Sequence, residues 1–365
     1  MCRTIALIFT IGIACVTAHA LPFVKKKSTK NKRMKKILLI TGYSLLLFPV
    51  LFARQVTDMA GRTVTIPDNI SRVVPYDNKT NVLLYPIAKE KMIVKARAKV
   101  SPDLKYITKD FLRLKEIDTR NAEEVLRINP DLIIVGAFVD NKNGLNSYIE
   151  FSEKINIPLI IVDLELTRLD KTYAFLGELF DCNEKAAEYV IYIQSVYTDI
   201  KNLGDKKTEG KAYLANETNG LRTAPYGSRH AQIFDIMNIE NVAHTKLNTD
   251  GFGIVSMEQV LIWNPGYIFC LGKGENGPYR TILKSALWRN INAVQNHKVY
   301  IIPSEPYPWF DMPPSINRLA GLIWFFNIFY DQPPEVTKNK VEEFYRLFYN
   351  YSLNDEEYEK LFKWQ

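Results

Sequence analysis

The stretch Asn121-Ala-Glu-Glu-Val-Leu-Arg-Ile-Asn-Pro-Asp-Leu-Ile-Ile134 recurs later in the chain as Ser256-Met-Glu-Gln-Val-Leu-Ile-Trp-Asn-Pro-Gly-Tyr-Ile-Phe269. Each copy starts with a helix-capping residue type, and the spacing fits a capping box, in which the cap and the side chain three positions later satisfy backbone N–H groups. The proline ends the helix and directs the chain into a buried strand. The repeat therefore predicts two α/β lobes of similar design, with Glu123 and Glu258 at equivalent helix starts.

The charge of the chain is concentrated at its N-terminus. The formal net charge is +7, but residues 1–53 contain many basic residues and no acidic one, and the remainder is close to neutral. A basic pI that comes from a leader gives no support to nucleic-acid binding. The length of 365 residues is sufficient for two domains.

The N-terminal segment has the layout of a secretory signal. Met34-Lys-Lys is a charged start, Ile37–Phe52 is apolar, and the signal ends at residue 53. We interpret residues 1–33 as an upstream extension, because their apolar run Ile5–Val16 is too short to span a bilayer. The sequence therefore predicts an exported, periplasmic protein. A membrane anchor formed by the N-terminal segment is the alternative.

The sequence contains no pattern typical of a metal site or of a known catalytic motif. Beyond the leader only Cys182 and Cys270 remain, in different predicted lobes, and they are read as small buried hydrophobic residues. Serine-hydrolase, zinc-protease and phosphate-loop spacings are missing from the sequence. We expect no cofactor, no bound metal and no enzymatic activity, with an exported enzyme as a remote alternative. The histidines, which show no ligand spacing, are His19, His230, His244 and His297.

The order of predicted elements indicates an α/β protein. Strands alternate with helices in both halves, which favours mainly parallel sheets flanked by helices. Residues 168–203 lack proline and repeat apolar residues at helical spacing, so we expect one long helix, or two nearly collinear helices, to join the lobes rigidly. The predicted domains are the leader 1–53 (extension 1–33 and signal 34–53), an N-terminal lobe 54–167, the linking helix 168–204, a C-terminal lobe 205–333 and a helical tail 334–365.

Five marks in the same order resemble the periplasmic substrate-binding proteins of ABC importers for ferric siderophores, haem and cobalamin. The resemblance covers about residues 54–330. It implies two lobes joined by a stiff helix, a ligand cleft between them and a small hinge motion. The marks are Val56-Thr-Asp-Met-Ala-Gly-Arg-Thr-Val-Thr-Ile-Pro67, Glu123 to Ile134, Gly220-Leu-Arg-Thr-Ala-Pro-Tyr-Gly-Ser228, Glu258 to Phe269 and Pro313-Pro-Ser-Ile-Asn-Arg-Leu-Ala-Gly-Leu322.

The same resemblance implies the partners. In the family, one surface Glu per lobe docks on arginines of the membrane permease, and Glu123 and Glu258 occupy those positions. Each Glu also has a simpler explanation, since a carboxylate at a helix start interacts favourably with the helix dipole. That effect explains each Glu alone but not the match between lobes. We expect a monomer that works with an ABC permease and its ATPase and binds no nucleic acid.

The predicted ligand residues lie on loops at the strand ends, where open α/β sheets place their sites. Aromatic side chains offer flat contact to a macrocycle or catecholate complex, and arginines offer forked donors for oxyanions. Core packing is the competing interpretation of the aromatics. The predicted set is Tyr76 and Asn78 (with Lys79) in the first lobe, Arg222, Tyr226, Ser228, Arg229 and His230 in the second, and Trp309, Phe310 and Arg318 near Pro313-Pro-Ser; Tyr106 and Phe138 are weaker candidates.

These observations predict a binding protein that captures an iron complex of the ferric siderophore type in the interlobe cleft and delivers it to the permease. One departure leaves the ligand open. Relatives often have Ser-Leu-x-Pro-Ser after the first strand, whereas this chain has Pro75-Tyr-Asp-Asn-Lys79. Cobalamin, haem and a small oxyanion such as molybdate or tungstate therefore stay as alternatives, and the arginine-rich loop of the second lobe keeps the oxyanion among them.

Overall fold

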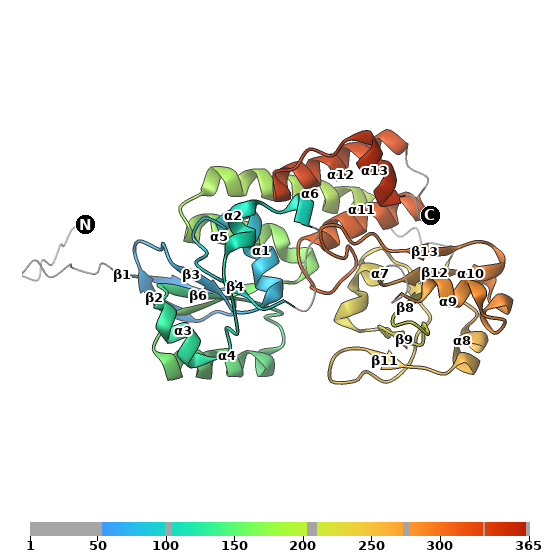
Figure 1. The fold of residues 1–365 in the computed structure, drawn as a ribbon, viewed down its shortest axis with the longest axis horizontal. Helices are drawn as coiled ribbons and strands as arrows, with labels where there is room; N and C mark the ends of the chain where they lie inside the picture. Colours follow the sequence, from blue (N-terminus) through green and yellow to red (C-terminus); the bar gives the residue numbers. More distant parts are fainter. Residues whose placement is uncertain (1–52, 99–103, 203–209, 273–276, 331–332, 363–365) are drawn as a thin grey trace, which may run out of the picture. The chain divides into compact units, whose positions relative to one another are not determined.

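The computed structural model describes residues 53–98, 104–202, 210–272, 277–330 and 333–362. The predicted leader therefore lies outside the described residues, apart from Ala53. Within these ranges, no helix combines the length and the apolar character needed to cross a membrane. Figure 1 shows the path of the chain.

The described residues begin with a β-hairpin. Strands β1 (Ala53–Thr57) and β2 (Thr63–Pro67) pair antiparallel. The Asp58 carboxylate accepts hydrogen bonds from the backbone N–H groups of Ala60 and Arg62 in the turn, and from the Arg62 guanidinium at 2.6 Å. It also accepts from the N–H of Ile161 in the first lobe. One buried carboxylate thus closes the turn and attaches the hairpin to the sheet.

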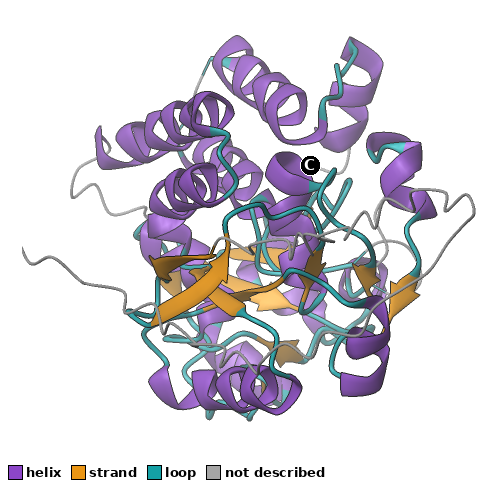
Figure 2. Ribbon diagram, turned by 90° about the vertical axis from the view of Figure 1, so that its left-hand side faces the viewer, coloured by secondary structure: helices purple, strands orange, loops and turns teal. Residues whose placement is uncertain are grey.

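The first lobe is a parallel sheet covered on both faces. Helices α1 and α5 lie on one face and α3 and α4 on the other (Figure 1), and Figure 2 shows helices on either side of the strands. All side chains of the three central strands are buried, as expected for a parallel sheet with two covered faces. The central strands are β3 (Val73–Pro75), β6 (Leu132–Ala137) and β7 (Leu159–Asp163) in the order β3-β6-β7; β4 (Lys95–Ala96) pairs with β5 (Glu116–Ile117), and the helices are α1 (Asn78–Ala88), α2 (Lys109–Arg113), α3 (Ala122–Ile128), α4 (Lys142–Ile155) and α5 (Leu169–Leu179).

The second lobe is also built on a parallel sheet, but the strands beside that sheet differ from those of the first lobe. Its main sheet is parallel throughout and has the order β10-β8-β12-β13, and a separate antiparallel pair, β9 with β11, lies beside it. Fold class and parallel sheets therefore agree with the sequence prediction. The elements are β8 (Lys211–Ala215), β9 (Arg222–Thr223), α7 (Gln232–Ile236), β10 (Glu240–Asn241), β11 (Gly253–Ile254), α8 (Met257–Trp263), β12 (Tyr267–Cys270), α9 (Tyr279–Lys284), α10 (Asn292–Gln295), β13 (Val299–Ile301) and α11 (Asn317–Phe329).

The repeated sequence forms the same local structure twice, as α3 followed by β6 and as α8 followed by β12. Asn121 accepts from two backbone N–H groups of the first turn of α3, and Ser256 accepts from one in α8. Both helices end on an asparagine with left-handed backbone, Asn129 (φ 52°) and Asn264 (φ 44°). Asparagine tolerates this conformation and the following proline cannot continue a helix, so Asn-Pro is a helix stop.

The capping box of the first copy is only half formed. The Glu124 carboxylate accepts from the N–H of Asp118, at 3.2 Å, and the N–H of Asn121 is bonded instead to the Asp118 carbonyl. The Glu side chain therefore fixes the turn before the helix and does not bond back to the cap.

The segment between the lobes is helical but not collinear. Helix α5 ends at Leu179, and α6 (Asn183–Asn202) begins after a turn in which Asp181 has a φ of 55°. Gln194 of α6 donates to Asp170 of α5, and the hydroxyl of Tyr197 accepts from the N–H of Leu169. These contacts pair the end of α6 with the start of α5, so the two helices are antiparallel. The expectation of a continuous or collinear helix over 168–203 is wrong, and α6 alone precedes the second lobe.

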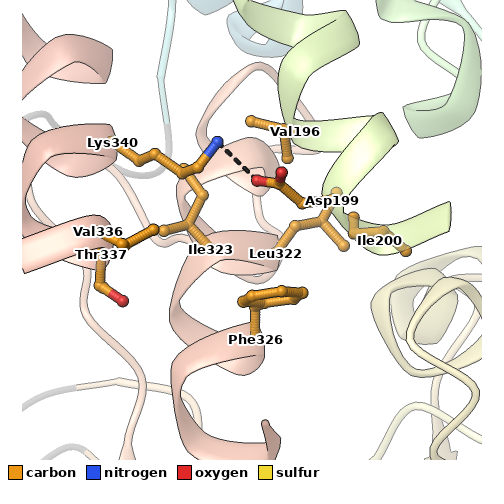
Figure 3. A pocket seen from close by; sticks show the side chains of 9 residues that line it. All are labelled: Val196, Asp199, Ile200, Leu322, Ile323, Phe326, Val336, Thr337 and Lys340. Carbon is orange, nitrogen blue, oxygen red and sulfur yellow. Dashed lines mark ion pairs between the residues drawn. The ribbon is translucent and has the colours of Figure 1, made fainter. Parts of the chain in front are cut away.

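The C-terminal tail, α12 (Pro334–Tyr349) and α13 (Asp355–Phe362), packs back on the body. The Tyr349 hydroxyl donates to the Asn317 side chain at 2.7 Å, and Tyr192 of α6 donates to the Lys340 carbonyl at 2.8 Å. Figure 3 shows the apolar contact of α6, α11 and α12 beside the Lys340–Asp199 ion pair. The cavity there is about 10 Å³, room for about one water molecule.

Gly321 of α11 lies very close to the backbone of Trp309. A Cβ atom added at Gly321 of α11 would lie 2.1 Å from the Trp309 carbonyl oxygen, which is backbone and cannot rotate away. We expect Gly321→Ala to lower the free energy of unfolding by about 1–3 kcal/mol, the range for overpacking. The measurement is urea unfolding followed by circular dichroism.

The matched control is Gly266→Ala, because the nearest atom to its added Cβ is 3.8 Å away. This control should leave the urea midpoint nearly unchanged. Equal midpoints for the two variants would contradict the packing assigned to α11.

Candidate functional site

A cluster of charged side chains joins the carboxyl ends of β6 and β7 to the second lobe. Arg318 of α11 donates to the carbonyl of Leu164, the residue after β7. The guanidinium groups of Arg229 and Arg318 lie over the Phe138 ring, 4.7 and 5.9 Å from its centroid. Phe138 follows β6 directly. The carboxyl ends of parallel strands are where open α/β sheets place ligand sites, so this cluster is the candidate site.

Arg318 is the buried cation of the cluster. Its side chain is almost completely buried, with Nη1 donating to the Gln232 side chain at 3.0 Å and Nη2 to the Leu164 carbonyl. Its Nε has no hydrogen-bond partner in the described structure. Burial lowers the pKa of Arg318, but the ordinary pKa of arginine is so high that the group stays charged. A buried cation with one unsatisfied donor marks a place where a ligand or water completes the shell.

His230 and Asp311 form an ion pair beside Arg318. The His230 Nδ1 bonds to Asp311 Oδ2, its Nε2 faces the Asp250 carbonyl at 3.0 Å, and its ring stacks on Phe252. Burial lowers the pKa of His230, but the hydrogen bond and the charge of Asp311 raise it further, so the net pKa lies above its ordinary value. The second carboxylate oxygen of Asp311 is buried without a partner in the described structure.

Arg229 is the accessible cation of the cluster. Its side chain is 40% exposed, and Glu165 at 3.7 Å is too distant to engage the guanidinium fork closely. Arg222, by contrast, is held by Asp250 at 2.7 Å and lies 4.1 Å from the centroid of Phe252. Arg229 therefore has donors to offer to a ligand, whereas Arg222 stabilises the loop against which His230 packs.

The first-lobe side of the cluster contains acidic residues that the sequence analysis missed. Asp163 ends β7 and accepts from Arg168 Nε at 2.6 Å, and Asp140 accepts from Arg168 Nη2 at 2.8 Å. The bond to Asp163 is the main reason that the pKa of Arg168 is raised. Glu165 lies two residues further along and faces Arg229. The sequence does contain a signal for these acidic residues, Asp163-Leu-Glu165 at the end of a buried strand. This position places both carboxylates at the same sheet edge as Phe138.

Three predicted aromatic ligand residues are core residues. Tyr76 is buried in the first lobe against Tyr148 and Phe151, with ring centroids 5.0 and 5.5 Å away. Trp309 is completely buried and donates its indole N–H to the Glu305 carbonyl. Phe310 is buried against two other phenylalanines. For these three the prediction of a cleft position is wrong, because each aromatic ring is buried among apolar residues of the core.

The other predicted first-lobe residues are on a helix and not in a loop. Asp77 caps α1, accepts from the Thr80 N–H at 3.0 Å and forms an ion pair with Lys79. Asn78 and Lys79 are therefore the first residues of α1, and Asn78 lines a separate cavity. Tyr106 is buried and donates its hydroxyl to Glu305 of the second lobe at 3.0 Å. The cluster therefore contains neither the two helix residues nor Tyr106.

Two further predicted residues of the second lobe have structural roles. Ser228 is buried, donates to the Gly251 carbonyl at 2.6 Å and caps the short turn Arg229–Ala231. It thereby positions Arg229 and His230. Tyr226 is 61% exposed and contacts His244 away from the cluster. Among the described residues, no group of three or more His, Cys, Asp or Glu could hold a metal ion.

Glu123 and Glu258 occupy the same position in their helices, the second residue of α3 and of α8. Both are exposed. Hydrogen bonds from its own backbone N–H and from Ser256 hold the pKa of Glu258 below its ordinary value. The two copies of the repeat thus present an exposed carboxylate at the same position of the helix.

Comparisons with known proteins agree with this architecture. The family described as periplasmic binding protein matches residues 73–306. The molybdate-binding protein MolA of Haemophilus influenzae is 26% identical over 360 residues, covering 88% of this chain and 97% of the relative. Its molybdate-bound structure has a TM-score of 0.65 at 22% identity, covering 82% of this chain and 99% of that one.

A solute-binding protein of an ABC transporter from Sulfurospirillum deleyianum has a TM-score of 0.74 at 24% identity, covering 85% of this chain and 99% of that chain. Proteins of this family bind a small ligand, work with an ABC permease, and are transport components rather than enzymes. The family resemblance of the five sequence marks is thereby confirmed, and the chain belongs to the periplasmic binding protein family.

Proposed function

We propose that this protein is the substrate-binding component of an ABC importer for a small oxyanion of the molybdate type, and that it acts as a monomer with a permease and an ATPase. The observation that carries the proposal is the pair of arginines, Arg229 and Arg318, whose guanidinium groups both lie within 6 Å of the centroid of the Phe138 ring, at 4.7 and 5.9 Å. The iron complex that the sequence analysis placed first is then the competing ligand.

The chemistry of the cluster suits an oxyanion. Guanidinium groups bind oxyanions through charge-assisted hydrogen bonds in a forked geometry. Arg229 has accessible donors, and Arg318 Nε lacks a partner in the described structure. An anion that approaches Arg229 would replace its loose 3.7 Å contact with Glu165. When its imidazole is protonated, His230 neutralises the charge of Asp311, which would otherwise repel an anion.

The placement of the aromatic residues argues against a large, flat ligand. Tyr76, Trp309 and Phe310 were the residues expected to receive a macrocycle or a catecholate complex, and all three are buried in the cores of their lobes. The ring of Phe138 is already covered by two guanidinium groups. A compact anion makes use of the remaining arginine donors without needing such a surface.

The relation to the molybdate-binding protein of Haemophilus influenzae supports the same class of ligand. The likeness extends over 97% of that protein. A tetrahedral oxyanion is also small enough to be bound with little movement of the lobes, which agrees with the single helix α6 that precedes the second lobe.

Titration of the purified protein with sodium molybdate tests the proposal. We expect saturable binding by isothermal titration calorimetry, and we expect Arg229→Gln to weaken it about 10- to 100-fold, the loss of one charge-assisted hydrogen bond. Arg289→Gln, an exposed arginine of the second lobe, is the matched control and should bind like the original protein. If a ferric catecholate complex binds and molybdate does not, the ligand is an iron complex and the oxyanion proposal fails.

The pH dependence of binding should report His230. Its raised pKa means that the imidazole is protonated at and below its ordinary pKa of about 6.5. Affinity for the anion should therefore fall as the pH rises from about 6.5 through the raised pKa and should then level off. Dissociation constants between about pH 6.5 and 9 measure this effect.

In His230→Gln the affinity should be low and nearly independent of pH over that interval, whereas His244→Gln should keep the original pH profile. A profile that is unchanged in His230→Gln would show that another group titrates.

We also propose that Glu123 and Glu258 dock on cationic groups of the permease. Their equivalent positions in the two lobes suit a partner with pseudo-two-fold symmetry, in which charge pairs set orientation and association rate. In proteoliposomes that contain the permease and ATPase, Glu123→Gln and Glu258→Gln should each lower binding-protein-dependent ATP hydrolysis about tenfold, with molybdate affinity unchanged. Glu178→Gln, an exposed acid on α5, serves as the control, and an equal loss in that variant would refute specific docking.

A further inference from the structure

A second cavity, lined by none of the residues of the arginine cluster, lies between α1, β4, α2 and the segment that joins β13 to α11. Its volume is about 300 Å³, at the lower end of the range for small-molecule sites. The wall is mainly apolar and includes Phe111 and Leu112. First-lobe residues form most of this wall, and Tyr307 comes from the segment after β13.

The Tyr307 side chain is the unusual member of this wall. It is 3% exposed, and its hydroxyl has no hydrogen-bond partner among the described residues. Burial raises the pKa of Tyr307 well above its ordinary value, so the hydroxyl keeps its proton and is a donor. Its oxygen is not among the buried side-chain atoms that lack a partner in the described structure, so the hydroxyl is accessible from the cavity. An accessible hydroxyl without a protein partner is available to bond to a ligand or to water.

Lys95 supplies a cation to the same cavity. Its side chain is 13% exposed, and Nζ donates to the Leu112 carbonyl at 3.0 Å. The Glu116 carboxylate is 3.8 Å from Nζ and half exposed. An ammonium group has three donors, and these contacts satisfy one of them closely. The cavity therefore combines a nearly buried cation, an unpartnered hydroxyl and an apolar wall.

We propose that this cavity binds a small organic acid with an apolar body. The carboxylate accepts hydrogen bonds from Lys95 Nζ and from the Tyr307 hydroxyl, and the apolar body packs on Phe111 and Leu112. Binding completes the hydrogen bonding of Tyr307, which an apolar ligand without acceptors cannot do. The site shares no residue with the arginine cluster, so it does not depend on the proposed oxyanion function.

Benzoate is a suitable probe, because it has one carboxylate on a flat apolar body. Isothermal titration calorimetry of the full protein with benzoate should show saturable binding. Tyr307→Phe keeps the ring and removes only the hydroxyl, so we expect affinity to fall about three- to tenfold. Lys95→Met removes the charge and should weaken binding about tenfold or more. Circular dichroism establishes that each variant is folded.

Two controls separate this site from the other. Tyr226→Phe changes an exposed tyrosine outside the cavity and should leave benzoate affinity unchanged. Arg229→Gln should also leave it unchanged, whereas loss of benzoate binding in that variant would place the anion at the arginine cluster and overturn the proposal. The absence of saturable benzoate binding, or binding that is indifferent to both Tyr307→Phe and Lys95→Met, would overturn it as well.

Discussion

The structure depends on one buried cation, Arg318. Its guanidinium donates from α11 of the second lobe to the carbonyl of Leu164, the residue after β7, so a single side chain links α11 to the end of the first sheet. A buried charge is tolerated only where hydrogen bonds and opposite charges compensate its desolvation. Gln232 provides a direct hydrogen bond, and Asp311 and Glu165 provide negative charge nearby. Through these contacts Arg318 brings residues of both lobes together at the candidate site.

The hydrogen-bonding groups of the cluster are not all satisfied by neighbouring residues. Arg318 Nε and Asp311 Oδ1 are both buried without a partner in the described structure, and Arg229 nearby meets Glu165 only at 3.7 Å. A site of this kind attracts an anion through donors that are already oriented, so little conformational freedom is lost on binding. Asp311 and Glu165 also limit the net positive charge of the cluster. This arrangement supports the proposed ligand, a small anion bound through hydrogen bonds as well as by charge.

The sequence predicted the features that arise from local chemistry. The repeat identified two lobes and equivalent helix starts, because capping residues and Asn-Pro act over a few positions, and the ends on Asn129 and Asn264 are the clearest case. Arg229 was expected outside the core, since arginine next to glycine and serine is rarely core, and its side chain is 40% exposed; its role in ligand binding stays a prediction. The aromatics were misplaced, because Tyr76 and Trp309 have no local signal that separates core from cleft. The turn at Asp181 was underestimated for a similar reason: three residues between two amphipathic helices are compatible with either a straight or a reversed path.

The segment between β13 and α11 gives the two sites a common support. It contributes Asp311 to the arginine cluster, Tyr307 to the second cavity and Glu305, which accepts a hydrogen bond from Tyr106 of the first lobe. The Glu305 carbonyl is in turn bonded to the indole of Trp309 and to the hydroxyl of Tyr345 in α12. This segment is thus fixed by the core of the second lobe and by the C-terminal tail. The tail therefore has a direct role in the geometry of both sites, although neither α12 nor α13 contributes a side chain to either of them.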